Sequence, residues 1–174
     1  PLIVYQRSIF NGLIEIIIPI DSMIKELSKQ KEDTNKVKIL AGISFSSKSI
    51  NPGEGLNYGQ QALDLATKLG WKKGVALADG TLGANYITKG DFNKGLEHFK
   101  EAIKIDEATG DKAATVKIYS NIGAAYYFQG NYPQAQEYYT LSIKTAEETG
   151  DKKGAAAAIG GLGNIYYAQN NYAK

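Results

Sequence analysis

A spacing of 40 residues recurs along the second half of the chain and constrains its fold more than any other feature. It relates the glycines Gly83, Gly123 and Gly163, and the tyrosines Tyr86, Tyr126 and Tyr166 that follow each glycine by three residues. A fixed period of about 20 to 50 residues indicates stacked structural repeats, because one such unit cannot bury its apolar face alone. The period therefore predicts an array with a long concave surface, and such surfaces usually bind other molecules.

Within each period, apolar residues at helical spacing alternate with short turns. The pattern predicts helices over 71–88, 92–108, 112–128, 132–148 and 151–167. At the first turn, Gly90 can adopt the left-handed conformation that ends a helix, and Asp91 can cap the next helix. Thr109-Gly110-Asp111 repeats this chemistry. A third turn is expected at Asn170-Asn171-Tyr172.

The period also divides the chain into domains. Residues 1–34 form an N-terminal segment with an apolar stretch and a short helix, and residues 35–174 form the repeat array. The array is expected to contain a degenerate unit over about 35–70, regular units over 71–110 and 111–150, and a truncated unit over 151–174. In the degenerate unit, Ile43-Ser44 is one residue out of register with Leu82-Gly83.

The truncated unit contains only its first helix, so we expect the natural protein to continue beyond Lys174. One apolar face of this helix would lack a cover, and exposed apolar patches usually find a partner. We therefore expect self-association through the C-terminal end. The residues expected on this face are Ile159, Leu162, Ile165 and Tyr166.

Composition excludes several classes of function. The chain has no Cys and a single His, His98, which excludes thiolate sites and the common metal sites. A chain without Cys suits either redox environment, so the compartment, cytoplasmic or periplasmic, stays open. Arg7 is the only Arg and the net charge is +2, which argues against a nucleic-acid partner. Charges interrupt the apolar N-terminal stretch, so no membrane span is expected. His98 is expected on a solvated helix face. We expect no catalytic residues, cofactor or metal.

Several motif positions recur together in register and resemble the tetratricopeptide repeat. One unit has Leu82-Gly83, Tyr86, Gly90-Asp91-Phe92, Gly95, Phe99 and Ala102, and the next has Ile122-Gly123, Tyr126, Gly130-Asn131-Tyr132, Ala135, Tyr139 and Ser142. The period of 40 departs from the commonest length of about 34. This longer form resembles arrays in bacterial sensor kinases and regulators. The resemblance implies an all-α, right-handed superhelix of helical hairpins.

In this family the first helix of each unit lines the concave groove, and the resemblance implies the residues that would contact a partner. They are Gly80, Ala84, Ile87, Thr88, Ser120, Ala124, Tyr127, Phe128, Asn164 and Tyr167, together with Gly160 and Ala168. Only Asn164 matches the clamp with which chaperone-binding members hold a carboxylate, so that clamp is not expected. Such a groove suits an apolar segment. Alternatively, the small residues serve only to permit tight curvature, and the sequence leaves both interpretations open.

These patterns together favour a protein- or peptide-binding scaffold, the sensory or interaction part of a larger bacterial signalling protein. One alternative is a peptide-pheromone or small-ligand receptor, which would need polar groups such as Thr88, Ser120 and Asn164 to converge in the groove. A second alternative is an enzyme whose catalytic domain lies outside this sequence.

Overall fold

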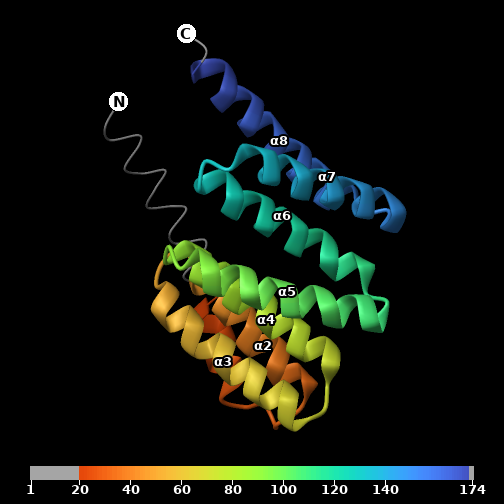
Figure 1. Ribbon diagram of the computed structural model, residues 1–174. Helices are drawn as coiled ribbons and strands as arrows, with labels where there is room; N and C mark the ends of the chain where they lie inside the picture. The colour runs from red at the N-terminus through yellow and green to blue at the C-terminus, as the bar shows by residue number, and fades with distance from the viewer. Residues whose placement is uncertain (1–19, 173–174) are drawn as a thin grey trace.

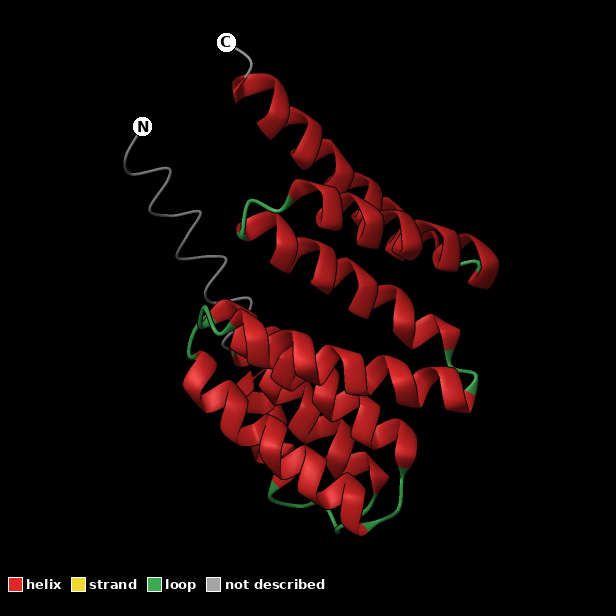
Figure 2. Ribbon diagram, in the orientation of Figure 1, coloured by secondary structure: helices red, strands yellow, loops and turns green. Residues whose placement is uncertain are grey.

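The computed structural model describes residues 20–172, and the regular secondary structure of that range is helical throughout (Figure 2). Residues 20–27 are helical. They are followed by α2 (Thr34–Ser47), α3 (Pro52–Lys68), α4 (Lys72–Thr88), α5 (Phe92–Thr109), α6 (Lys112–Phe128), α7 (Tyr132–Thr149) and α8 (Lys152–Tyr172). The predicted all-α helical repeat array is confirmed. The apolar stretch expected within residues 1–19 lies outside the described residues. Within the described range, no helix combines the length and apolar character needed to cross a bilayer.

Short glycine-containing turns fix where the helices end. Glycines with positive φ recur every 20 residues, at Gly70, Gly90, Gly110, Gly130 and Gly150. Asp91 follows one of them and accepts a hydrogen bond on its side chain from the Lys94 N–H, at 3.2 Å. The predicted roles of Gly90 and Asp91 are therefore confirmed, because the glycine takes a conformation that other residues rarely adopt and the aspartate satisfies a free N–H of the next helix.

The turn expected at residues 170–172 does not form, and α8 continues to Tyr172. At the two equivalent positions, Gly90 and Gly130 have φ of 84° and 73°. Asn170 occupies this position in the third unit.

The helices form hairpins that stack one above another along the array (Figure 1). Each hairpin packs its first helix on its second, α2 on α3, α4 on α5, and α6 on α7. The first helices also pack on one another between units, α2 on α4, α4 on α6, and α6 on α8. In contrast, the backbones of α5 and α7 do not come into contact within the described range. Each second helix packs instead on the first helix of the next unit, α3 on α4, α5 on α6, and α7 on α8.

Two aromatic rings seated on glycines set the distance between the helices of a hairpin. Phe99 of α5 is completely buried, and a β-carbon at Gly83 of α4 would lie 2.6 Å from its ring atoms. Tyr139 of α7 lies in the same way against Gly123, where a β-carbon would be 3.0 Å from the ring. The other side of the Tyr139 ring lies against Gly161 of α8. Glycine weakens a helix by about 1 kcal/mol relative to alanine, and here it makes room for a ring.

Gly163 occupies the same register position in α8 but has a different environment. A β-carbon at Gly163 would meet no described atom within 4 Å. A ring therefore lies against the repeated glycine at Gly83 and Gly123 and not at Gly163. This difference provides a matched pair of positions for testing the packing.

A buried amide joins the first hairpin to the second. Asn85 of α4 is fully buried, and its Nδ2 donates to the backbone oxygen of Ser44 in α2, to the Ser44 hydroxyl and to the Thr81 oxygen, at 3.0, 3.1 and 2.9 Å. Gly59 stands where the next unit has Phe99, and a β-carbon there would lie 2.9 Å from the Ser44 hydroxyl. This hairpin therefore lacks the ring-on-glycine packing, and a β-carbon at Gly59 would also lie 2.8 Å from Leu82 of α4.

We predict opposite effects for alanine at the two matched glycines. Gly83→Ala should lower the free energy of unfolding by about 1–2 kcal/mol, because overpacking against the buried Phe99 ring exceeds the gain in helix propensity. Gly163→Ala should raise it by up to about 1 kcal/mol, because only the propensity gain remains. Urea denaturation followed by circular dichroism measures both. Equal shifts of the two variants in the same direction would contradict the packing described here.

Candidate functional site

Three of the predicted groove residues, Ser120, Ile87 and Ala84, make contacts inside the hairpins. The Ser120 hydroxyl of α6 lies 2.8 Å from the hydroxyl of Ser142, a fully buried residue of α7. Ile87 of α4 lies against Gly95 of α5. Ala84 is buried, with 6% of its surface exposed. The groove prediction placed these residues on an open surface, but the first two face the second helix of their own hairpin and Ala84 is packed in the core.

Tyr127 is also held by its own hairpin. Its ring centroid lies 5.8 Å from that of Tyr132, which begins α7, and 5.8 Å from that of Phe128. Tyr127 and Ala124 are both half-buried and pack against the cluster around Tyr139. Tyr127 therefore serves mainly as packing, whereas its neighbour Phe128 is 70% exposed.

Tyr167 of α8 lies at the register position of Ile87 and Tyr127, but 72% of its surface is exposed. Ile159 and Tyr166 on the same helix are 57% and 50% exposed. Ile159, Gly163, Tyr166 and Tyr167 lie at the register positions that, in α4 and α6, face the second helix of the hairpin. The self-association prediction had included Leu162 and Ile165 in this face. However, Ile165 is 1% exposed and Leu162 is half-buried, because both pack against α7.

The remaining predicted residues belong to a solvent-facing strip along the first helices. In α6 the strip contains Lys117, Asn121, Ala124 and Phe128, which share one helix face at spacings of four, seven and eleven residues. We call the strip on the three helices the open strip. Its members are Leu77 and Thr88 of α4, the four α6 residues just given, and Ala157 and Asn164 of α8. Gly80 and Gly160 flank it, and a β-carbon on either would meet open space. Ala168 is half-buried at its end.

The sequence interpretation missed Leu77, Lys117, Asn121 and Ala157. Leu77 is 41% exposed and is a large apolar side chain in the open strip. Asn121 is half-buried, and its carboxamide offers both a donor and an acceptor. The signal that could have located them is the helical spacing from Phe128 back to Lys117, which selects one solvent-facing side of α6.

His98 does not lie on a solvated face, contrary to the expectation from sequence. Its Nδ1 lies 2.9 Å from Oδ1 of Asp79, a carboxylate that is 6% exposed. The imidazole also stacks on Tyr86, with centroids 5.3 Å apart and an interplanar angle of 8°. In the next unit, the positions of Asp79 and His98 hold Tyr119 and Tyr138. A polar pair in one hairpin is thus replaced by an aromatic pair in the next.

Asp106, near the end of α5, is a buried carboxylate. Its residue surface is 2% exposed, and its Oδ2 has no hydrogen-bond partner among the described residues. Burial raises the pKa of Asp106 from its ordinary value of 3.8 to about 6, with a further upward contribution from Asp111 and a downward one from Lys73. The equivalent positions in the neighbouring units hold Ala66 and Ala146, which are also buried. Asp106 is therefore an exception within the repeat.

Comparison with known proteins places the repeats in a family. The family model described as "Tetratricopeptide repeat" matches residues 74–148 and 115–174, which together cover more than half of the chain. No curated protein sequence matches the chain.

Solved structures share the fold at low sequence identity. A Rap protein complexed with Competence and Sporulation Factor has a TM-score of 0.81 and 22% identity, with 95% of this chain and 48% of that chain covered. Aspartyl phosphate phosphatase F from Bacillus subtilis has a TM-score of 0.74 and 17% identity, with 98% of this chain and 50% of that chain covered. A signal transduction ATPase with a tetratricopeptide repeat sensor from Pyrococcus horikoshii has a TM-score of 0.61 and 18% identity, covering 96% and 31%. The chain spans half or less of each.

We predict that Asp106→Ala stabilises the protein in a pH-dependent way. The folded state holds the Asp106 proton between about pH 4 and 6, whereas the unfolded state has already released it, so ionisation of Asp106 destabilises the fold as pH rises through this window. Alanine should therefore raise the free energy of unfolding near pH 8 by up to about 3 kcal/mol, since each pKa unit is worth about 1.4 kcal/mol. The gain should be smaller near pH 4.

Urea denaturation at the two pH values measures this effect. The exposed Asp64 provides a control, and Asp64→Ala should change stability little at either pH. A stability loss for Asp106→Ala at pH 8 would show that Asp106 makes a favourable contact in the folded protein, contrary to its assignment as an unpartnered carboxylate.

Proposed function

The chain belongs to the tetratricopeptide repeat family, and on that premise we propose that it is a protein- or peptide-binding scaffold module in bacterial signalling. The array carries the binding surface and performs no chemical step itself. The Rap protein, which was crystallised with Competence and Sporulation Factor, and the signal transduction ATPase with a tetratricopeptide repeat sensor share this fold. These similarities support a sensory or interaction role within a larger protein.

The observation that carries this proposal is the composition of the open strip. Phe128 and Leu77, the large apolar side chains of the strip, are exposed by 70% and 41%. Asn121 and Asn164 add carboxamides, each of which can match the N–H and C=O of a peptide group. An apolar anchor beside such amides suits a polypeptide segment better than a small polar metabolite.

The receptor alternative requires polar groups that converge on a small ligand. Ser120 bonds to Ser142, and the Thr88 hydroxyl donates to the Ala84 backbone oxygen at 2.9 Å. The side chain of Asn164, the third polar residue that this alternative needs, is exposed and has no side-chain hydrogen bond to another described residue. The geometry therefore favours a polypeptide over a small ligand.

We predict that Phe128 is the main anchor of the open strip. Peptides selected from a random display library on the immobilised protein should bind Phe128→Ala roughly tenfold more weakly or worse, because buried aromatic anchors commonly contribute about 2 kcal/mol or more. Tyr127→Ala should act through reduced stability, because Tyr127 packs on Tyr132. Fluorescence anisotropy with labelled peptides measures the affinities.

The control is Lys144→Ala, a change of an exposed residue on α7, which should leave affinity unchanged. Circular dichroism would verify that both variants remain helical. An equal loss of affinity for Phe128→Ala and Lys144→Ala would place the binding surface elsewhere, and a library that yields no binding peptide would refute the scaffold proposal.

A further inference from the structure

A groove follows the outer side of the array between α5 and α7, with α6 as its floor. It has two connected parts that share Glu107 and Tyr119. The first, of about 250 Å³, is lined by Asp106, Glu107, Gly110, Lys112, Thr115, Tyr119, Thr145 and Glu148, and we call it the Asp106 cavity. The second, of about 300 Å³, is lined by Lys100, Ile103, Lys104, Glu107, Tyr119, Tyr138 and Leu141. We call the whole the α5–α7 groove. It lies on the second-helix side of the array and is separate from the open strip.

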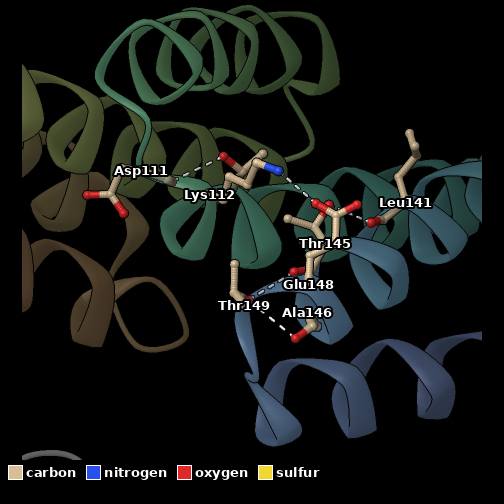
Figure 3. Close-up of polar contacts among 8 residues, drawn as sticks. Asp111, Lys112, Leu141, Thr145, Ala146, Glu148 and Thr149 are labelled. Carbon is tan, nitrogen blue, oxygen red and sulfur yellow. Dashed lines mark hydrogen bonds and ion pairs between the residues drawn. The ribbon is translucent and has the colours of Figure 1, made fainter.

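The Asp106 cavity has an excess of negative charge. Asp106, Glu107 and Glu148 contribute three carboxylates, and Lys112 contributes one ammonium. Figure 3 shows that Lys112 of α6 reaches Glu148 of α7, at 2.8 Å. Nearby Lys73 of α4 is paired at 3.0 Å with Asp111. Both lysines at this end are thus engaged with other carboxylates, so Asp106 and Glu107 are not neutralised within the cavity.

The unpartnered Oδ2 of Asp106 indicates a missing hydrogen-bond donor. Buried polar groups in folded proteins nearly always have a partner, and a buried carboxylate without one is costly. Alanine fills this position in both neighbouring units, so the fold itself does not need an acid here. The pKa of about 6 leaves Asp106 largely ionised at neutral pH despite its burial. These observations together point to a cationic donor supplied from outside the chain.

The geometry does not favour a bare metal ion as the missing partner of Asp106. Among the described residues, no three His, Asp or Glu side chains are placed to hold a metal. In contrast, Tyr119 lies between the two parts of the groove and offers a ring face that can attract an organic cation. The stretch beyond it is formed by Ile103, Tyr138 and Leu141, which suits a hydrocarbon chain.

Lys100 and Lys104 line the far part of the groove. Their positive charges would repel a second ammonium at the other end of a ligand, so an α,ω-diamine fits less well than a monoamine.

We propose that the α5–α7 groove binds a primary alkylammonium group. The ammonium is attracted by the carboxylates of Asp106 and Glu107, and the alkyl stem lies along Tyr119 and Tyr138. Two sources share this chemistry, a lysine side chain of a partner polypeptide and a free alkylamine. This site is independent of the open strip, so each can be tested while the other is intact.

Titrations of the whole protein, followed by backbone and tyrosine NMR shifts, test the proposal with two probes. The first is Nα-acetyl-lysine N-methylamide, which represents a lysine within a polypeptide, and the second is n-hexylamine. We expect saturable shifts at Glu107 and Tyr119 with at least one probe. Tighter binding of the lysine derivative identifies a polypeptide source, and tighter binding of hexylamine identifies a free amine.

Variants and a matched ligand sharpen this test. Asp106→Ala should weaken binding roughly tenfold or more, equivalent to about 1.4 kcal/mol, while the protein remains folded as judged by thermal melting. Phe128→Ala should leave binding unchanged. Trimethylhexylammonium, which has the charge but no N–H donor, should bind more weakly than hexylamine. The proposal is overturned if neither probe gives saturable shifts in the groove, or if Asp106→Ala binds both probes as tightly as the parent.

Discussion

The seating of Phe99 on Gly83, and of Tyr139 between Gly123 and Gly161, is the contact on which the rest of the structure depends. A ring that lies directly on a helix backbone fixes the distance between two helices, and a β-carbon at either Gly83 or Gly161 would force them apart. The same contact recurs after 40 residues, in the α4–α5 and α6–α7 hairpins. The α5–α7 groove lies between the second helices of these two hairpins.

Much of this architecture could be predicted from the sequence because its determinants are local. Gly90 and Asp91 favour the end of one helix and the start of the next through their own conformational preferences, and the repeated Gly83 and Gly123 leave room for a close helix contact. The orientation of each helix face could not be predicted in the same way. Tyr127 and Phe128 are adjacent aromatic residues, and only the position of α7 determines that Tyr127 packs in the hairpin while Phe128 faces solvent.

Asp106 could not be recognised as buried from its residue type, because an acid near the end of a helix normally faces water. The relevant signal was the repeat itself, since Ala66 and Ala146 occupy the equivalent positions. A charged residue at a position that the fold fills with alanine in the neighbouring units lowers stability, and we connect it with the proposed alkylammonium site. The array thus presents two chemically different surfaces, an apolar and amide-bearing strip on its first helices and a groove between its second helices whose Asp106 end is acidic.

A double-mutant cycle between Gly83 and Phe99 tests the central packing claim most directly. Free energies of unfolding would be measured for the parent, Gly83→Ala, Phe99→Leu and the double variant. If the ring fixes the helix separation, alanine at position 83 should destabilise the parent but not the Phe99→Leu background, which gives a coupling free energy of about 1 kcal/mol or more. If the two changes are additive within about 0.3 kcal/mol, the ring does not rest on the glycine and the basis of the repeat lies elsewhere.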